Sequence, residues 1–226
     1  NHSAPLPQKL ILFLFFISGA LALVYQVVWS RLMTHVFGST ALAVGTVIAA
    51  FMAGMAVGSW WFGKLADRSQ NSLRLYAMIE IGIAITALLA HLALDALYSA
   101  YPAIYQMVSN SVLLTGVVRF LLAFVLIMTP TILMGATLPV LIRLLAMGRG
   151  EAGRSLSTLY AVNTFGAVAG VLLTGFFLIG RFGIHIPVYM AVVGNLMVGI
   201  VALMAAHRLP GGNMAGTPVA GASAEL

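Results

Sequence analysis

The sequence contains no cysteine and very little charge. Without cysteine, the chain has no disulfide framework, no thiolate metal site and no cysteine nucleophile. Only 7% of its 226 residues are charged, whereas 62% are hydrophobic, and an average soluble domain has about 25% charged residues. A soluble globular enzyme is therefore excluded, and so is a disordered chain, which needs low hydrophobicity. The class that remains is an all-α, polytopic membrane protein.

Two motifs of nucleotide and acyl chemistry are also missing. The sequence has no G-x-x-x-x-G-K-[ST] phosphate-binding loop and no G-x-S-x-G nucleophile elbow. The net charge of +6 comes from basic residues scattered between apolar segments, which is typical of loops that set membrane topology. We therefore expect a lipid bilayer as the surroundings, no nucleic-acid partner and no cofactor.

Six segments are long and apolar enough to cross a membrane, since a spanning helix needs about 20 such residues. They cover residues 9–29, 40–62, 73–94, 119–142, 155–180 and 184–207, within a membrane domain of residues 9–208. Residues 1–8 form a short N-terminal tail, and residues 209–226 are rich in Gly and Pro, which predicts a flexible tail or linker. The connection over residues 95–118 contains Tyr98, Tyr101, Pro102 and Tyr105 and predicts an aromatic segment at the membrane interface.

The basic residues indicate the orientation of the chain. With the N-terminus inside, the inner side holds Lys9, Lys64, Arg68, Arg74, Arg143, Arg149, Arg154 and Arg208. The outer side holds Arg31, Arg119 and Arg181. Because basic residues favour the cytoplasmic side, we predict that both ends are cytoplasmic. We also expect the protein in a bacterial inner membrane.

Glu80 is an acidic residue within a predicted span, and an intramembrane carboxylate is a functional candidate by default. It is a candidate proton or cation site, or it pairs with a basic residue of an inner loop; the sequence leaves both open. Tyr25, Gln26, Arg31 and Asn163 are further polar candidates for a substrate path. Bonding between helices is the more frequent role of such residues.

Glycine and proline mark positions of packing and of helix breaks. Gly54 and Gly58, like Gly166 and Gly170, follow the four-residue spacing that lets helices approach closely. This spacing indicates either a sliding surface or a static seam. Pro130 and Pro139 predict a break or kink in the fourth span, which is a binding-site feature in some transporters and a structural kink in many helices.

Three histidines, His35, His91 and His185, fall toward the predicted outer face. They are weak candidates for binding a metal, haem or quinone. None shows a ligand spacing within one helix, so we predict no metal site.

Three stretches together resemble a known family. They are Ser18 to Leu32 (SGALALVYQVVWSRL), Pro130 to Pro139 (PTILMGATLP) and Leu159 to Gly170 (LYAVNTFGAVAG). In this order they resemble the membrane-integral half of the spermidine synthase-like proteins. That half is a bundle related to the major facilitator superfamily, often fused to an aminopropyltransferase domain. The loop Gly63 to Arg68 (GKLADR) is similar to a facilitator-family cytoplasmic loop.

The resemblance implies one six-helix facilitator-like half without the catalytic domain, hence no enzyme activity in these residues. It implies a module that transports or senses a small cationic solute such as a polyamine. Because a facilitator half provides one wall of a cavity, we expect a homodimer or another membrane subunit. The alternatives are a non-transporting anchor or assembly subunit and, more weakly, an electron-transfer subunit that uses the outer histidines.

Overall fold

A computed structural model describes residues 8–37, 40–69, 71–108, 112–146 and 152–208. The described residues form a bundle of helices and contain no strand. Its six long helices are α1 (Gln8–Phe37), α2 (Thr40–Arg68), α3 (Ser72–Val108), α4 (Val112–Ala146), α5 (Ala152–Leu173) and α7 (Ile186–His207). The π-helical segment η1 (Thr174–Leu178) and the short α6 (Ile179–Phe182) continue α5 without a gap. The predicted tails lie outside the described residues, except for Gln8 of the first.

Each long helix contributes a segment that is long and apolar enough to span a membrane, so the predicted six-span, all-α architecture is confirmed. Large apolar side chains also cover the outside of the bundle; Phe176 is 76% exposed, Phe165 70% and Met52 64%. An outer surface of this kind is stable in lipid and unfavourable in water. The bundle is therefore a membrane module.

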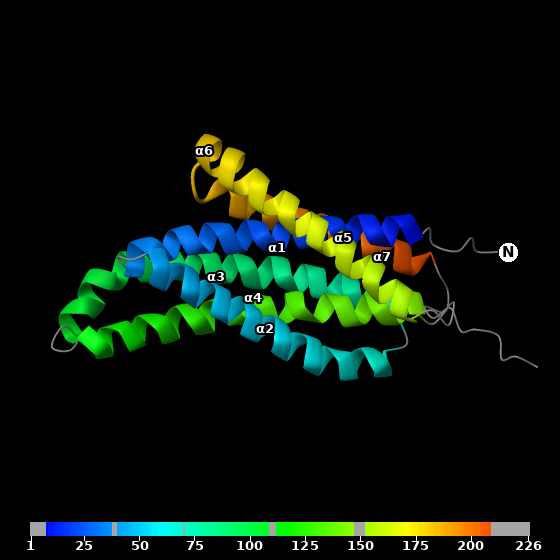
Figure 1. Cartoon of the computed structure of the whole chain (residues 1–226), viewed down its shortest axis with the longest axis horizontal. Helices are drawn as coiled ribbons and strands as arrows, with labels where there is room; N and C mark the ends of the chain where they lie inside the picture. The colour runs from blue at the N-terminus through cyan, green and yellow to red at the C-terminus, as the bar shows by residue number, and fades with distance from the viewer. Residues whose placement is uncertain (1–7, 38–39, 70, 109–111, 147–151, 209–226) are drawn as a thin grey trace, which may run out of the picture.

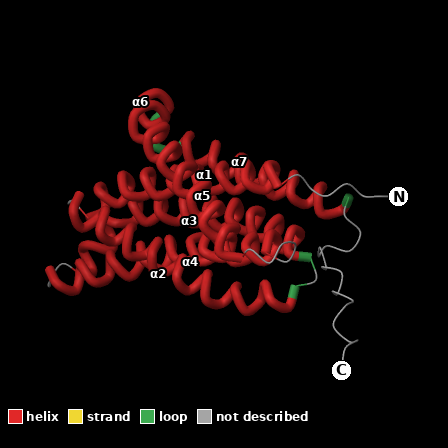
Figure 2. The backbone as a smooth tube through the Cα atoms, turned by 45° about the vertical axis from the view of Figure 1, so that its right-hand side comes forward, coloured by secondary structure: helices red, strands yellow, loops and turns green. Residues whose placement is uncertain are grey.

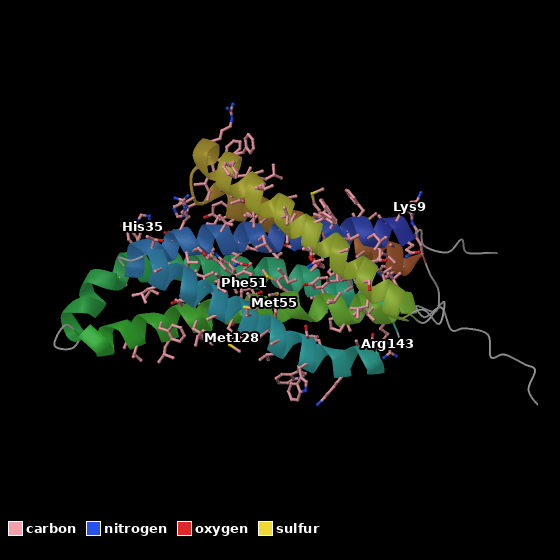
Figure 3. All side chains as sticks on the ribbon, in the orientation of Figure 1. Lys9, His35, Phe51, Met55, Met128 and Arg143 are labelled. Carbon is pink, nitrogen blue, oxygen red and sulfur yellow. The ribbon has the colours of Figure 1, made fainter. Side chains whose placement is uncertain are left out.

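Both described termini lie at the same end of the bundle (Figure 1). The view in Figure 2, turned by 45°, shows the same arrangement. We call the end with Gln8 and His207 the terminal end and the opposite one the far end. Lys9 and Arg143 lie at the terminal end and His35 lies at the far end (Figure 3). The terminal end is the one that the basic residues predict to be cytoplasmic.

The first four helices are longer than predicted. α1 continues to Phe37 and α2 to Arg68, so the predicted cytoplasmic loop from Gly63 to Arg68 belongs to α2. α3 continues to Val108 and α4 begins at Val112, so most of the predicted interfacial connection is helical. Its sequence is rich in Ala, Leu and Tyr and lacks a stop signal before residue 108 other than Pro102. The Tyr98 ring packs edge-on against His35, with 5.9 Å between ring centroids. The side chains at 101–116 lie outside the described ones.

α4 passes through both prolines as one helix, so the structure shows no break at Pro130 or Pro139. Proline lacks an N–H and leaves the carbonyl four residues earlier without its helical partner. For Pro139 that carbonyl belongs to Gly135, and it accepts a hydrogen bond of 2.8 Å from the Ser59 hydroxyl on α2. This bond between helices compensates for the one that Pro139 removes.

The chain contains an internal repeat that relates α1–α3 to α4–α7. Four glycines, Gly54, Gly58, Gly63 and Gly82, recur at one constant offset along the chain as Gly166, Gly170, Gly175 and Gly194. The contacts repeat as well. A Cβ on Gly58 would collide with the Ile132 carbonyl, and a Cβ on Gly170 with the carbonyl of Ala20, which the same offset relates to Ile132. Because each unit has three antiparallel spans, the second unit is inverted relative to the first.

The four predicted packing glycines lie at two equivalent helix crossings. Gly54 and Gly58 of α2 face α4, while Gly166 and Gly170 of α5 face α1. Each crossing leaves no room for a side chain at these positions. At the end of α6, Gly183 adopts φ 77°, a conformation that favours glycine. It turns the chain into α7, which begins with Pro187 in its first turn.

Candidate functional site

Glu80 lies on the inward face of α3, in the half of the bundle nearer the terminal end, and is completely buried. Its two carboxylate oxygens have different partners. The Ser18 hydroxyl of α1 donates to Oε1 at 2.6 Å, and the Asn195 side-chain amide of α7 donates to Oε2 at 2.7 Å. One carboxyl group therefore joins three helices that are far apart in the sequence.

Asn195 extends this network back to α1. Its side-chain oxygen accepts a hydrogen bond of 2.9 Å from the Tyr25 hydroxyl. Ser18 and Tyr25 are seven residues apart, which places both on one face of α1. Asn195 and Tyr25 are buried, so the chain of bonds Tyr25–Asn195–Glu80–Ser18 is shielded from the surroundings.

Tyr76 completes the group, which we call the Glu80 cluster: Ser18, Tyr25, Tyr76, Glu80 and Asn195. Tyr76 precedes Glu80 by one helical turn on α3 and is fully buried. Its hydroxyl lies beside Glu80 and Ser18, close enough to interact with both. Tyr76 is therefore a further polar neighbour of the Glu80 carboxyl group.

The partners of Glu80 are uncharged. Among the described side chains, no Lys, Arg or His contacts its carboxylate, whose neighbours are a serine, an asparagine and a tyrosine. Of the two interpretations of Glu80, pairing with a basic residue is thus not seen in the part of the chain that the structure describes. An unpaired charge in a bilayer is costly. The surroundings suit either protonation state, because a serine hydroxyl both donates and accepts.

Three other predicted path residues lie apart from the Glu80 cluster. Gln26 is half-buried on α1 and takes no part in the bonds of the cluster. Arg31 is exposed toward the far end of α1. Asn163 of α5 lies against Gly19 of α1, next to Ser18 in the sequence, so it approaches the cluster without bonding to it.

The histidines divide into a pair and a single residue. His91 of α3 and His185, just before α7, lie with Nε2 and Nδ1 3.2 Å apart. His35 is not part of this pair and contacts Tyr98 instead. Within the described residues, no group of three or more His, Asp or Glu side chains is placed to hold a metal ion.

Ser18, Tyr76 and Asn195 were not among the residues selected from the sequence. One signal was available: Asn195 is the single amide in the apolar sixth span. Its partner depends on how α7 is rotated against α3, and a span that is apolar all round does not define that rotation. Ser18 and Tyr76 are common residue types in membrane helices and carry no comparable signal.

The bundle and its buried polar cluster define a multi-pass membrane module. No family profile matches the chain, and no solved structure matches it. The chain is similar to polyamine aminopropyltransferase 1 of Streptomyces coelicolor, with 27% identity over 206 residues. This similarity covers 91% of the chain and 34% of the relative. The chain thus spans about a third of the length of the curated relative it matches.

Proposed function

We propose that this chain is the membrane module of a spermidine synthase-like protein and that it transports or senses a small cationic solute such as a polyamine. The observation that carries the proposal is the Glu80 carboxyl group, buried in the membrane region among neutral donors. Such a group is the natural counter-charge for an amine or a proton. The name of the Streptomyces relative points to the same class of solute.

The internal repeat supports transport in particular. Three-helix units in inverted orientation build each half of the facilitator transporters, which carry their substrate between two halves. The two equivalent crossings, α2 on α4 and α5 on α1, follow that plan. We therefore interpret the chain as one facilitator-like half. The orientation with both ends in the cytoplasm is part of the proposal and is supported by the basic residues. The location in the inner membrane of a bacterium is part of the proposal as well.

In this proposal Glu80 binds its cation only when helices separate. The carboxylate is fully enclosed by α1, α3 and α7, so a polyamine reaches it after α1 or α7 moves away from α3. The bonds from Ser18 and Asn195 are then exchanged for bonds to an ammonium group. The Tyr76 hydroxyl, which lies beside Glu80, offers a further acceptor for such a donor.

The experiment that tests this role measures spermidine binding to the purified protein and spermidine uptake into proteoliposomes. We expect Glu80→Gln to weaken binding at least about tenfold, equivalent to about 1.4 kcal/mol, and to abolish uptake. Glu80→Asp keeps the charge and should retain part of both. Thr86→Val is the matched control, since it removes a hydroxyl of α3 that bonds to its own helix at the Gly82 carbonyl. Folded Glu80→Gln protein with the affinity and uptake of the parent would refute the assignment.

A second candidate function is a membrane anchor or assembly subunit, and the exposure of the fifth span favours it. Only 17% of that span is buried inside the bundle, compared with 39–50% in the other five spans. A second copy or another membrane subunit would cover this face. We also propose that the 226 residues do not transfer aminopropyl groups themselves, because the resemblance assigns that chemistry to a separate domain with a glycine-rich loop.

A further inference from the structure

The histidine pair His91–His185 connects the same two helices as the Glu80 cluster, at a second level closer to the far end. His185 stands at the start of α7, and its ring lies 5.3 Å from that of His91 between centroids. The Tyr189 ring meets His91 edge-on at 5.7 Å. The pair joins the start of α7 to the middle of α3, whereas Glu80 and Asn195 meet closer to the terminal end.

α3 and α7 therefore have polar contacts at two levels. His91 follows Glu80 by eleven residues, or about 16 Å along the helix. Between the two levels, the helices pack through small and apolar buried side chains, among them Ala84, Ala87, Val188 and Ala191. Apolar packing between helices is not directional and gains little in lipid. The histidine pair is thus the directional contact that holds the far end of α7 to α3.

The positions of the protons in this pair follow from hydrogen-bond accounting. His91 is completely buried, and its Nδ1 has no partner. A proton on Nδ1 would be a buried donor without an acceptor, which is costly. We therefore place the His91 proton on Nε2, from which it is donated to Nδ1 of His185. His185 is exposed, so its other nitrogen is accessible to the surroundings.

Protonation breaks this arrangement from either side. A proton added to His185 occupies the Nδ1 lone pair that accepts the bond. The reversed bond, from His185 Nδ1 to His91 Nε2, would require the His91 proton on its buried Nδ1, which has no partner. A proton added to His91 is buried at Nδ1 without a partner. The titratable groups beside the pair are Asp95, one turn further along α3, and Tyr189 of α7. Arg181 of α6 is exposed. The Asp95 carboxylate is the opposite charge that an imidazolium would meet here.

We propose that His91 and His185 form a proton-operated clasp, which holds the far end of α7 to the middle of α3 when both rings are neutral and releases it when His185 is protonated. Imidazole is the side chain whose charge ordinarily changes between about pH 5 and 8. Because the far end is the predicted outer side, the clasp would report the pH of the outer compartment. The proposal stands apart from any role of Glu80 in binding a solute.

The test uses the absence of cysteine, which allows labels to be placed without background. Spin labels at Leu92→Cys and Ile186→Cys, exposed positions next to the two histidines, report the separation of the helices through dipolar broadening. We expect strong broadening in nanodiscs at about pH 8 and its loss at about pH 5, the range over which imidazole titrates. His185→Asn retains an acceptor in place of Nδ1 but cannot be protonated, and should keep the broadened spectrum at both pH values.

Two further variants complete the test. His185→Ala should give the weakly broadened spectrum at both pH values, and His35→Gln should leave the pH response unchanged because His35 contacts Tyr98 instead. Glu80→Gln should also respond to pH as the parent does, which separates this proposal from the proposed function. A spectrum of the parent that does not change with pH would overturn the clasp. So would a pH response that persists in His185→Asn, or one Zn²⁺ per chain in the purified protein that is lost in His185→Ala.

Discussion

At the scale of single residues, the bundle satisfies buried polar groups through bonds between helices. The Ser18 and Asn195 side chains donate hydrogen bonds to Glu80. The Ser59 hydroxyl donates one to the Gly135 carbonyl, which Pro139 leaves without its helical partner. In lipid there is no water to replace a lost partner. Removing one member of such a contact should therefore lower the free energy of unfolding more than removing a hydroxyl that bonds to its own helix.

The pair Ser59 and Pro139 allows this difference to be measured. Ser59→Ala should lower the free energy of unfolding by about 1–2 kcal/mol, because the Gly135 carbonyl loses the hydrogen bond that it accepts. In a Pro139→Ala background the restored N–H can bond to that carbonyl, so the cost of Ser59→Ala should fall by roughly 1 kcal/mol. Reversible unfolding in mixed micelles measures both values. Thr164→Ala, which removes a hydroxyl bonded to the Tyr160 carbonyl of its own helix, is the control. Equal costs of Ser59→Ala in the two backgrounds would contradict this account of the proline.

At the scale of helices, the sequence predicted the number and approximate position of the spans, because about 20 apolar residues between charged boundaries leave few alternatives. It did not predict that α3 continues to Val108 or that a π-helical segment lies at Thr174–Leu178. Nor did it place Asn195 against Glu80, since both helices are apolar around most of their circumference and the register between them depends on packing. The candidate site was therefore predicted as separate residues, of which Glu80 and Tyr25 turned out to share one network.

The helix crossings make a prediction that is repeated within one molecule. Gly58→Ala and Gly170→Ala should each destabilise the protein by about 1–3 kcal/mol, because the added methyl group collides with backbone of the facing helix. Gly63→Ala should be neutral or stabilising by about 0.5–1 kcal/mol, since a Cβ there meets no other atom and alanine favours helix. Thermal unfolding of the three variants gives the comparison. A crossing that tolerates alanine as Gly63 does would show that the contact is looser than described.

At the scale of the whole molecule, the exposure of the fifth span is the strongest departure from an evenly covered bundle. Tyr160, Phe165, Phe176 and Phe177 all lie on its outside. Lipid would tolerate such a face, but so would a second copy of the chain, which the proposed function requires if substrate passes between two halves.

Cross-linking in native membranes distinguishes these two environments. Single cysteines at Phe165 and Val168 should form disulfide-linked dimers, because the proposed interface brings copies of α5 together. Single cysteines at Met52 of α2 and Leu89 of α3 are exposed controls on other faces and should remain monomeric. Uniform cross-linking at all four positions, or none at α5, would argue that the fifth span faces lipid or a different subunit.

The internal repeat also bears on the candidate site. The glycines that bring the helices together occur in both units, as expected of a duplicated segment whose architecture was retained. The Glu80 cluster is not duplicated: the positions that the repeat relates to Ser18, Tyr25, Glu80 and Asn195 hold Pro130, Thr137, Val192 and Ile83. The two units therefore share the glycines of the helix crossings, whereas the buried carboxyl group and its partners occur once. The bundle is symmetric in its packing and asymmetric in its chemistry.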